Sequence, residues 1–452
     1  GEIVLAVASS GVAALLMPGG RIAHSRFRIP IDIHDRSMCA IRRGTILGDL
    51  IRKASLIIWD EAPMTHKLCF EALDRTLRDI QSADEPANEY KPFGGKPILL
   101  GGDFRQVLPV IEKGTRADVV DASLVRSALW KHVEVLHLTT NMRLHNPSLS
   151  QQARGELAEF AKWVLDIGEG RAPMNKRQGE VERTWIEIPK ELLLTPCGDK
   201  ITAIIDAVYP DFELNYDCIP YLSQRAIVCP VNTIVDEIND NMLAKVPGDA
   251  KDYLSSDTIS NTLEKPVDFD LLYPIEFLNS ISINNFREHR ISLKIGSAVV
   301  LLRNINQSLG LCNGTRLMVT RLGDYVFESK IMTGTNIGQL VCIPWIVLSG
   351  NSPKWPFTLQ RRQFPIRLCY AMKINKCQGQ TLGNVGVYLR NPVFTHGQLY
   401  VTVLRATSKQ GLKLLIEDDD GKPCSTTGTS STLKYYRCCR LILLSVCHCD
   451  CS

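Results

Sequence analysis

The distribution of apolar residues predicts a parallel sheet in the first part of the chain. Short apolar runs occur at 3–8, 56–59 and 97–100, and each is followed by polar residues or glycine. Unbroken apolar runs of this length are typical of strands buried on both faces, as in parallel sheets covered by helices. The carboxyl ends of parallel strands meet at one edge of a sheet, and open α/β folds bind ligands there. The residues that follow these runs are therefore the first candidates for a functional site.

Two acids, Asp60 and Glu61, directly follow the run at 56–59. Asp60 could hold a hydrated Mg²⁺ on the phosphates of a nucleotide, and Glu61 could orient and deprotonate an attacking water. The alternative is a strand end with two solvated carboxylates. The residue pair alone does not decide between these interpretations.

A second unit of the same design favours the functional interpretation. The run at 97–100 is followed by two glycines at 101–102, which permit a tight turn, and then by Asp103 and Gln106. If this strand lies in the same sheet, Asp103 and Gln106 are placed to sense a γ-phosphate or its attacking water. We therefore expect a nucleotide site at this edge.

The first residues predict a strand, a polar turn and a short helix. The apolar stretches 3–8 and 11–17 resemble the core of a signal peptide, but no basic segment precedes them and Ser9-Ser10 interrupts them. Ser9, Ser10 and the Gly11 amide would be free to bond phosphate oxygens at the start of the helix. The alternative is a simple helix cap.

Later segments predict further helices and strands. The spacing of apolar residues predicts helices at 70–80, 149–167 and 231–246, with a strand at 225–232 leading into the last of them. Residues 294–335 contain short strands separated by turn residues, a pattern that predicts a small β-barrel.

Composition narrows the class of protein without identifying it. The 452 residues are 45% hydrophobic, enough for two or three cores, and the net charge is only +4, so a nucleic-acid surface would have to be local. Cysteines lack paired metal-ligand spacing and predict reduced intracellular thiols. No transmembrane run is present in the sequence.

Several segments resemble, in chain order, the motifs of one family. They are residues 9–11 for motif Ia, 59–62 for motif II, 101–106 for motif III, 138–143 for motif IV, 370–382 for motif V and 396–408 for motif VI. Residues 20–27 continue the pattern of the same family after motif Ia. Together they resemble the Pif (petite integration frequency) family of superfamily 1B ATP-dependent DNA helicases, and the Helitron-type transposon branch looks nearest.

The resemblance implies a role for each matched residue. The catalytic set would be Asp60, Glu61, Gln106, Arg143 and the arginine finger Arg405. The ATP contacts would be Asp60, Asp103, Gln106, Arg143, Gly379, Gln380 and Arg405, with Mg²⁺ on Asp60 and Glu61. The single-stranded DNA contacts would be Ser9, Ser10, Gly11, His24, Ser25, Arg26, Phe27, Lys376, Gln378 and Thr381. A ring such as Phe27 beside a cluster of arginines suits single-stranded DNA, because bases stack on aromatic rings.

The resemblance also implies an α/β fold, with two RecA-like parallel-sheet motor domains and a small SH3-like β-barrel insertion. The expected division is domain 1A at 1–145, a connector at 146–220, domain 2A at 221–292 and 367–420, the 2B insertion at 293–366, and a divergent cysteine-rich tail at 421–452. The tail lies outside the resemblance, and we expect it to be disordered.

The phosphate loop of the family, Gly-x-x-x-x-Gly-Lys-Ser/Thr, does not occur in these 452 residues. In the family this Walker A loop lies one βα unit ahead of the strand at 3–8, so domain 1A is expected to be truncated at its N-terminus. Without the loop, we expect no ATP hydrolysis by residues 1–452.

Three hypotheses about function remain. The first is an ATP-dependent 5′-to-3′ DNA helicase that couples hydrolysis to translocation and unwinding, in DNA repair, recombination, telomere maintenance or Helitron transposition. The second is a truncated, hydrolysis-deficient helicase relic that only binds single-stranded DNA. The third is an unrelated nucleotide-handling enzyme such as a kinase, which would not need the second motor domain. The helicase hypotheses predict single-stranded DNA and duplex junctions as partners, a monomer, no membrane, and an intracellular location, the nucleus before the mitochondrion.

Overall fold

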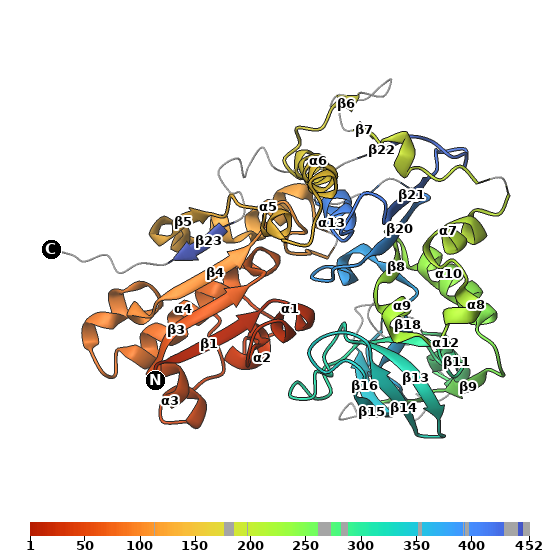
Figure 1. Ribbon diagram of the computed structural model, residues 1–452. Coiled ribbons are helices and arrows are strands. Elements are labelled where there is room, and N and C mark those ends of the chain that lie inside the picture. Colours follow the sequence, from red (N-terminus) through yellow and green to blue (C-terminus); the bar gives the residue numbers. More distant parts are fainter. Residues whose placement is uncertain are drawn as a thin grey trace. The chain divides into compact units, whose positions relative to one another are not determined.

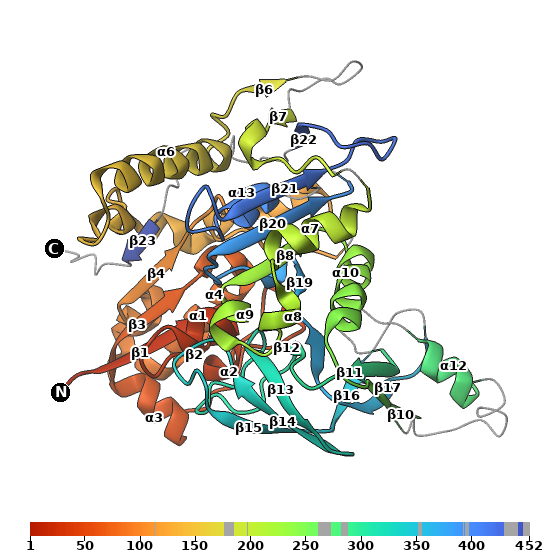
Figure 2. The ribbon, with the colours of Figure 1, turned by 45° about the vertical axis from the view of Figure 1, so that its right-hand side comes forward.

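The computed structural model describes residues 1–112, 114–175, 185–196, 198–260, 273–281, 288–350, 355–391, 393, 397–428 and 442–445. Contacts between residues divide the chain into two compact units. The first consists of Gly1–Cys197 with Ile374–Ser452, and the second is Gly198–Lys373. Figures 1 and 2 show the ribbon of both units, which are described in turn.

The first unit is built on a six-stranded sheet with the strand order β2-β1-β3-β4-β23-β5 (Figure 1). Its strands are β1 (Ile3–Ala8), β2 (Arg21–Ile22), β3 (Ala54–Asp60), β4 (Ile98–Gly102), β5 (Glu134–His137) and β23 (Ile442–Ser445). The pairs β1–β2, β1–β3 and β3–β4 are parallel. The predicted parallel sheet and its three strands are therefore confirmed.

Strand β3 lies at the centre of this sheet, between β1 and β4, and its core side chains explain that position. Ile57 and Trp59 are fully buried. The Trp59 ring packs against Phe27 and Phe70, with ring centroids 5.9 and 4.5 Å apart. Burial of large aromatic side chains is among the strongest contributions to a core. The packing fixes the end of β3, and with it the two acids that follow.

The first unit also contains helices and short 3₁₀ turns. The helices are α1 (Gly11–Leu15), α2 (Ala23–Phe27), α3 (Ile46–Lys53), α4 (Lys67–Gln81), α5 (Arg116–Ala122), α6 (Gln151–Gly168) and α13 (Gln398–Val403). Its 3₁₀ turns include η1 (Ala62–Met64), η6 (Met142–His145) and η8 (Ile374–Lys376). Helices α4 and α6 confirm the helices predicted at 70–80 and 149–167.

The first unit also contains a parallel pair, β20 (Asn384–Leu389) with β21 (Leu412–Ile416). A small antiparallel sheet has the order β22-β7-β6, formed by β22 (Thr426–Gly428), β7 (Trp185–Glu187) and β6 (Met174–Asn175).

The tail is not disordered throughout, and the prediction is wrong for the parts of it that the structure describes. Strand β22 pairs with β7, and β23 pairs antiparallel with both β4 and β5. Ile442, for example, lies opposite Gly102 on one side and His137 on the other. The reason is that β4 and β5 are not paired with each other, so their facing N–H and C=O groups need a partner strand. Most of the tail cysteines lie outside the described residues.

The second unit combines a parallel pair with antiparallel sheets. Its helices are α7 (Lys200–Val208), α8 (Phe212–Asn215), α9 (Ile219–Ser223), α10 (Asn232–Lys245) and α12 (Ile275–Ser280). Strand β8 (Arg225–Cys229) pairs in parallel with β19 (Ala371–Lys373). The strand and helix predicted at 225–246 are confirmed by β8 and α10.

Short antiparallel strands form the rest of the second unit, as the turn-rich sequence predicts. One sheet has the order β15-β14-β13-β12-β18, a second has β10-β17-β16, and β11 pairs with β9. These strands are β9 (Lys251–Leu254), β10 (Ser256–Ile259), β11 (Arg290–Leu293), β12 (Ala298–Leu301), β13 (Arg316–Leu322), β14 (Val326–Ile331), β15 (Leu340–Pro344), β16 (Ile346–Gly350), β17 (Leu359–Gln363) and β18 (Ile366–Leu368). Their core includes the fully buried Leu317, Phe327 and Phe364.

Among the described residues, no helix has the length and apolar character needed to cross a membrane.

Candidate functional site

The carboxyl ends of β1 and β3 place Asp60 and Glu61 at one edge of the central sheet of the first unit. Ala8 and Asp60 are register partners, and the Ser9 amide donates a hydrogen bond of 3.1 Å to the Asp60 carbonyl. The Asp60 carboxylate accepts a hydrogen bond of 2.9 Å from the Glu61 amide. Both acids therefore lie where parallel α/β sheets bind their ligands.

Glu61 has a strained backbone conformation. Its φ of 53° and ψ of 36° lie in the left-handed region, which non-glycine residues adopt rarely. Such a conformation persists only where the surrounding structure enforces it, and it is concentrated at functional sites. The strain is independent support for a role of Glu61 in chemistry.

The environment of Glu61 gives its carboxyl an unusual pKa. Burial and then the Asp60 charge raise the pKa, Asp103 adds to this, and Arg405 and a hydrogen bond from Gln378 oppose it, so that the value is about 7. A general base works best when its pKa lies near the working pH. A carboxyl with this pKa can gain and lose a proton near neutral pH.

We expect Glu61→Gln to stabilise the fold at pH 8. The glutamate has its ordinary pKa of 4.5 in the unfolded chain and about 7 in the folded one, so the folded state binds the proton more tightly. The stability contributed by this group is fully present below pH 4.5 and is lost as the pH rises through 7. A neutral glutamine avoids this loss, on the order of 2 kcal/mol above pH 7.

Urea unfolding of both proteins from pH 5 to 8, with EDTA to remove divalent cations, measures this difference. The stability advantage of Glu61→Gln should grow as the pH rises. An advantage that is the same at pH 5 and pH 8 would contradict the raised pKa.

The loop after β4 brings Asp103 and Gln106 close to these acids. Asp103 is buried, and its charge raises the pKa of Glu61, so the two carboxyls are close enough to interact. The backbone amide of Gln106 donates a hydrogen bond of 3.1 Å to the Asp103 carbonyl. The side-chain oxygen of Gln106 accepts a hydrogen bond of 3.1 Å from the side-chain amide of Gln378. A residue 272 positions away thus contacts Gln106.

Residues 376–381 separate into two groups by burial. Lys376 and Thr381 are exposed, whereas Gln378 and Gln380 are 4% and 7% exposed. The side-chain oxygens of both glutamines are buried and have no hydrogen-bond partner among the described residues. Unpaired buried acceptors are costly and call for a donor, such as a bound water or ligand hydroxyl. The Gln378 side chain hydrogen-bonds Gln106 and Glu61, so it points toward the acids and not outward with Lys376 and Thr381.

Gly379 lies between these two glutamines and makes the turn possible. Its φ of +80° is favourable only for glycine, and a Cβ placed on it would lie 3.6 Å from Val12 of α1. The segments that resemble motifs Ia and V are therefore neighbours in the first unit.

Arg405 follows α13 and is also part of this group. Its guanidinium is buried and donates hydrogen bonds to the carbonyls of Val401 and Gln380, at 3.0 and 2.9 Å. Its charge lowers the pKa of Glu61. The structure therefore brings together Glu61, Gln106, Gln378 and Arg405, which come from four segments of the chain.

Arg143 is not brought into this group. It lies in the exposed turn η6, where its amide donates a hydrogen bond of 3.1 Å to the Asn141 side chain. Its contact with a nucleotide remains a prediction from the resemblance.

The acids fit a magnesium ion that arrives with a nucleotide. Asp60 and Asp103 both raise the pKa of Glu61, and a divalent cation would offset this negative charge. Within the described residues, no three His, Cys, Asp or Glu side chains are arranged to hold a metal alone. Mg²⁺ usually binds through one or two carboxylates and completes its shell with water and substrate phosphates.

The hydroxyl groups near the start of α1 already have protein partners. Ser9 Oγ lies 2.7 Å from Thr65 Oγ1 and accepts a hydrogen bond of 3.0 Å from Trp59 Nε1. Ser10 Oγ accepts a hydrogen bond of 3.2 Å from the Ala13 amide and caps the helix. The helix-cap interpretation is therefore confirmed for Ser10. DNA contacts by these serines and by the buried Gly11 remain predictions.

The segment 20–27 presents basic and polar groups. Ser25 is exposed, and the buried Arg26 Nε has no hydrogen-bond partner among the described residues. Burial and the nearby Arg21 charge lower the pKa of Arg26, so an anion beside these two arginines would be favourable. Burial also lowers the pKa of His24, which favours a neutral imidazole.

Phe27 does not fit the role that the resemblance implies. Its side chain is fully buried and packs against Trp59. A ring in the core cannot stack on a nucleic-acid base, so this prediction is corrected. The apolar side chain contributes to the core that fixes β3.

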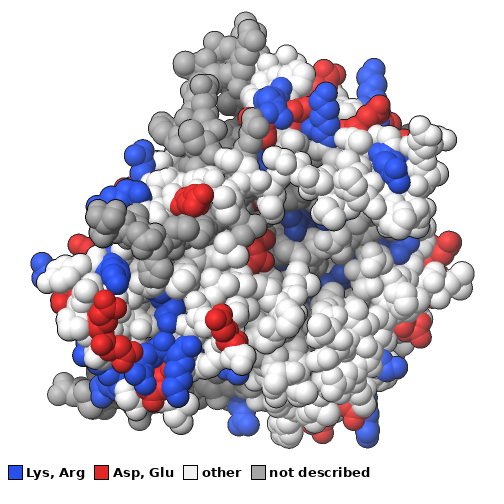
Figure 3. Space-filling model, turned by 60° about the vertical axis from the view of Figure 1, so that its left-hand side comes forward, with Lys and Arg blue, Asp and Glu red and all other residues white. Residues whose placement is uncertain are grey.

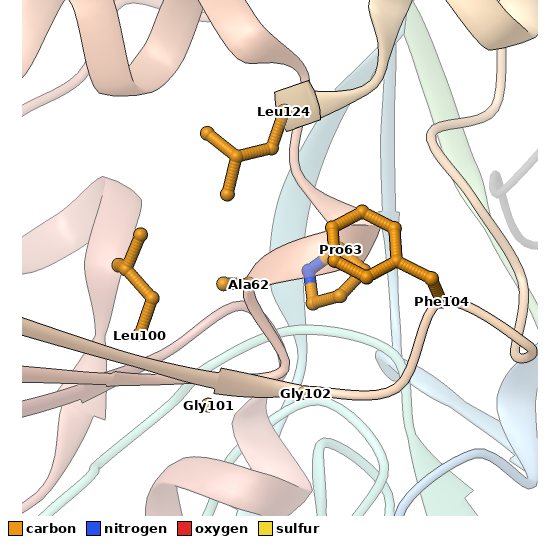
Figure 4. Close-up of a pocket in the computed structure, with 7 residues that line it drawn as sticks. All are labelled: Ala62, Pro63, Leu100, Gly101, Gly102, Phe104 and Leu124. Atoms are coloured by element: carbon orange, nitrogen blue, oxygen red, sulfur yellow. The ribbon is translucent and has the colours of Figure 1, made fainter. Parts of the chain in front are cut away.

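A small pocket at the carboxyl end of β4 has an apolar lining (Figure 4). Its lining residues are Ala62, Pro63, Leu100, Gly101, Gly102, Phe104 and Leu124. None of these side chains offers a charge or hydrogen-bond donor to a phosphate. The pocket therefore does not replace a phosphate-binding loop.

Charge is mixed on the face of the molecule that Figure 3 shows. In the view of Figure 3, lysine and arginine side chains lie among acidic ones and do not cover the face as a single basic field. This agrees with the small net charge of +4. Any contact with a nucleic acid would have to use local groups such as Arg21 and Arg26.

Some buried polar residues of this region were not singled out from the sequence. Arg105 donates to Asp103 at 2.7 Å and to Glu169 at 3.4 Å, and the Tyr400 hydroxyl donates to Asp103 at 2.9 Å. Glu169 and Tyr400 are 64 and 295 positions from Arg105, so no local pattern indicates these contacts. The only available signal was the position of Tyr400 within the segment that resembles motif VI.

Known proteins match most of the chain. The sequence model of the family described as PIF1-like helicase matches residues 1–178, and that of the DNA helicase Pif1 2B domain matches residues 276–322. The ATP-dependent DNA helicase PIF1 of Homo sapiens is 26% identical over 432 residues, covering 93% of this chain and 55% of the human protein. The Psychrobacter protein of the same name is 24% identical and is covered over 62% of its length. The chain thus spans little more than half the length of the curated relatives it matches.

Solved structures show the same fold. A Bacteroides Pif1 crystal structure with bound single-stranded DNA superimposes with a TM-score of 0.61 at 19% identity, covering 95% of this chain and 90% of that one. Candida albicans Pif1 gives a TM-score of 0.56 at 20% identity, covering 96% and 88%. The predicted α/β fold with RecA-like parallel sheets is confirmed, whereas the domain division and the SH3-like β-barrel insertion stay predictions. The resemblance found in the motifs is confirmed as well, because the models of the PIF1-like helicases and of the Pif1 2B domain both match this chain.

Proposed function

We propose that this chain is the motor region of an ATP-dependent 5′-to-3′ DNA helicase. The observation that carries the proposal is the convergence of Glu61, Gln106, Gln378 and Arg405 at the carboxyl edge of the sheet. A base of raised pKa, an amide that can orient water and an arginine are groups that enzymes of phosphoryl transfer to water use together with a phosphate loop and Mg²⁺. The human relative is named as an ATP-dependent DNA helicase, and the Bacteroides structure contains bound single-stranded DNA. Both support the same function.

Each group has a defined task in this proposal. When bound, ATP with Mg²⁺ supplies the phosphoryl group and the cation that neutralises its developing charge. Asp60 holds a water or oxygen ligand of the cation, and Glu61 takes the proton from the attacking water. Gln106 and Gln378 orient that water through their amides. Arg405 adds positive charge where the transferred group carries negative charge.

A second function is favoured by one specific observation. The 452 residues contain no phosphate loop, and in the sheet the position between β4 and β5 is filled by an antiparallel strand of the tail. The sheet could instead accept a parallel βα unit there. Residues 1–452 alone are therefore proposed to bind single-stranded DNA without hydrolysing ATP.

We propose that the strand follows the exposed groups of the neighbouring segments at 9–28 and 376–381. Lys376→Ala should weaken single-stranded DNA binding about equally for all sequences and reduce the salt slope by about one unit. The reason is that a lysine on phosphate releases one counterion and reads no base. Fluorescence anisotropy with labelled oligonucleotides from 50 to 300 mM NaCl measures the slope.

Lys162→Ala is the matched control, because Lys162 is an exposed lysine on α6, outside both proposed DNA-contacting segments. The control should bind like the unmodified protein. An unchanged slope in Lys376→Ala would show that Lys376 does not contact phosphate. If the unmodified protein itself does not bind single-stranded DNA, the proposed function fails.

The finer assignments follow from this function. We propose duplex junctions as the substrate, a monomer as the active form, and the nucleus as the location, with the mitochondrion as the alternative. Roles in repair, recombination, telomere maintenance or Helitron transposition remain predictions. Duplexes with a single 5′ or 3′ tail, tested for unwinding, distinguish the polarity.

A further inference from the structure

Asp103 uses both of its carboxylate oxygens within the protein. Oδ1 accepts hydrogen bonds from the Arg105 amide at 3.0 Å and from Arg105 Nε at 2.7 Å. Oδ2 accepts a hydrogen bond of 2.9 Å from the Tyr400 hydroxyl. All three side chains are at most 5% exposed. Charge-assisted bonds in such a buried place are strong, and they direct Asp103 away from a phosphate ligand.

Close contacts of the Tyr400 ring fix the direction of its hydroxyl group. The Arg105 guanidinium lies over the Tyr400 ring, 5.5 Å from its centroid, and also reaches Glu169 at 3.4 Å. At the end of α6, a Cβ on Gly168 would come within 2.5 Å of the same ring. Because close packing leaves no space for another orientation, the ring cannot move without disturbing α6 or the loop after β4.

A separate observation shows that α13 docks on this loop. Gly397 precedes α13, and a Cβ on it would lie 2.4 Å from the Arg105 carbonyl oxygen and 2.7 Å from the Gln106 carbonyl carbon. The helix start therefore touches the backbone that carries Gln106. Arg405 lies just beyond the other end of this six-residue helix.

We propose that Asp103, Arg105 and Tyr400 form a docking clamp that fixes α13 on the loop after β4 and so sets the position of Arg405 relative to Gln106. Tyr400 is a positioning residue in this clamp. Asp103 is its anchor and does not contact the nucleotide, in contrast to the role implied by the resemblance. The docking itself does not depend on the proposed function, whereas its importance for hydrolysis does.

Tyr400→Phe tests the clamp because it removes the hydroxyl and keeps the ring. The matched control is Tyr388→Phe, since the Tyr388 hydroxyl also bonds a buried carboxylate, that of Glu417, away from the clamp. In the 452-residue chain, hydrogen–deuterium exchange should become about tenfold faster at 398–405 and at 103–107 in Tyr400→Phe, since one charge-assisted hydrogen bond is lost. In Tyr388→Phe the faster exchange should be confined to β20 and β21.

A spectroscopic readout separates positioning from stability. The side-chain amide of Gln378 bonds Gln106, so its ¹⁵N–¹H resonances report the loop that Asp103 anchors. They should shift in Tyr400→Phe and stay in place in Tyr388→Phe, even where the two variants unfold at the same urea concentration. Unshifted Gln378 resonances in Tyr400→Phe would overturn the proposal.

A comparison of Asp103→Ala with the double variant Asp103→Ala and Tyr400→Phe provides a second test, in case Tyr400→Phe alone folds poorly. Removal of the hydroxyl should have little further effect on exchange once Asp103 is absent, because the two act as one unit. Additive effects would mean that Tyr400 does not act through Asp103, and they would overturn the clamp. If neither the unmodified protein nor any variant bound DNA or hydrolysed ATP, the proposed function would be refuted. The exchange and resonance results on the clamp would still hold.

Discussion

Joining a βα unit with a Gly-x-x-x-x-Gly-Lys-Thr loop to the amino end of residues 1–452 is expected to create DNA-stimulated ATP hydrolysis where there was none. Catalysis of phosphoryl transfer consists almost entirely of positioning and charge stabilisation. In the 452-residue chain, Glu61 is tuned as a base, but no lysine and nest of amides hold the β- and γ-phosphates.

The sheet indicates where the added strand belongs. Strand β23 is antiparallel to β4 and β5, whereas β1, β2, β3 and β4 are parallel to one another. A parallel strand in this position would deliver its loop to the carboxyl edge, beside Asp60 and Gln106. The added unit should therefore displace the tail strand.

Phosphate release with and without single-stranded DNA measures the effect. The same fusion with Glu61→Gln, or with the added lysine changed to alanine, is the control, and each should lose hydrolysis by at least about a hundredfold. Vigorous hydrolysis by the unextended chain would show that another part of it holds the triphosphate.

Arg405→Ala in the extended protein is expected to reduce kcat by about a thousandfold or more. Arg405 is buried, its guanidinium is fixed by two backbone carbonyls, and its charge already acts on Glu61. A charge held in place at a water-poor site stabilises a developing anion much better than a mobile one. Arg405→Lys should recover only part of the rate, because an ammonium lacks the planar fork of a guanidinium.

Arg154→Ala is the control, since Arg154 is an exposed residue of α6. Its kcat should equal that of the extended protein. Thermal unfolding of each variant shows whether the fold is retained. A folded Arg405→Ala protein with normal kcat would exclude this arginine from the chemistry.

The two acids illustrate how much of the site could be predicted. The run at 56–59 indicates a buried strand, and a strand end in a parallel sheet must lie at the ligand-binding edge, so the placement of Asp60 and Glu61 followed from local pattern. The pKa of Glu61 could not be predicted in this way. It depends on burial and on charges at 103 and 405, which only the folded chain brings near.

The matches to motifs did not predict which of the matched side chains are buried. Lys376 and Thr381 are exposed, as a strand-contacting role requires, but Gln378 between them is buried against Gln106. A match to a motif names the residues of a turn and does not say which way each side chain points. That direction depends on what the turn packs against.

The sequence by itself determined the parallel strands, the helices α4, α6 and α10, the acids at the sheet edge and the resemblance to one family. These depend on periodicity and on short motifs, which are local properties of the chain. The tertiary structure decided that Phe27 belongs to the core, that Asp103 anchors Tyr400, and that β23 completes the sheet. Each of these results depends on a contact between residues far apart in the chain. Burial and hydrogen-bond partners at such distances are set by close packing of the whole unit, and no local pattern encodes them.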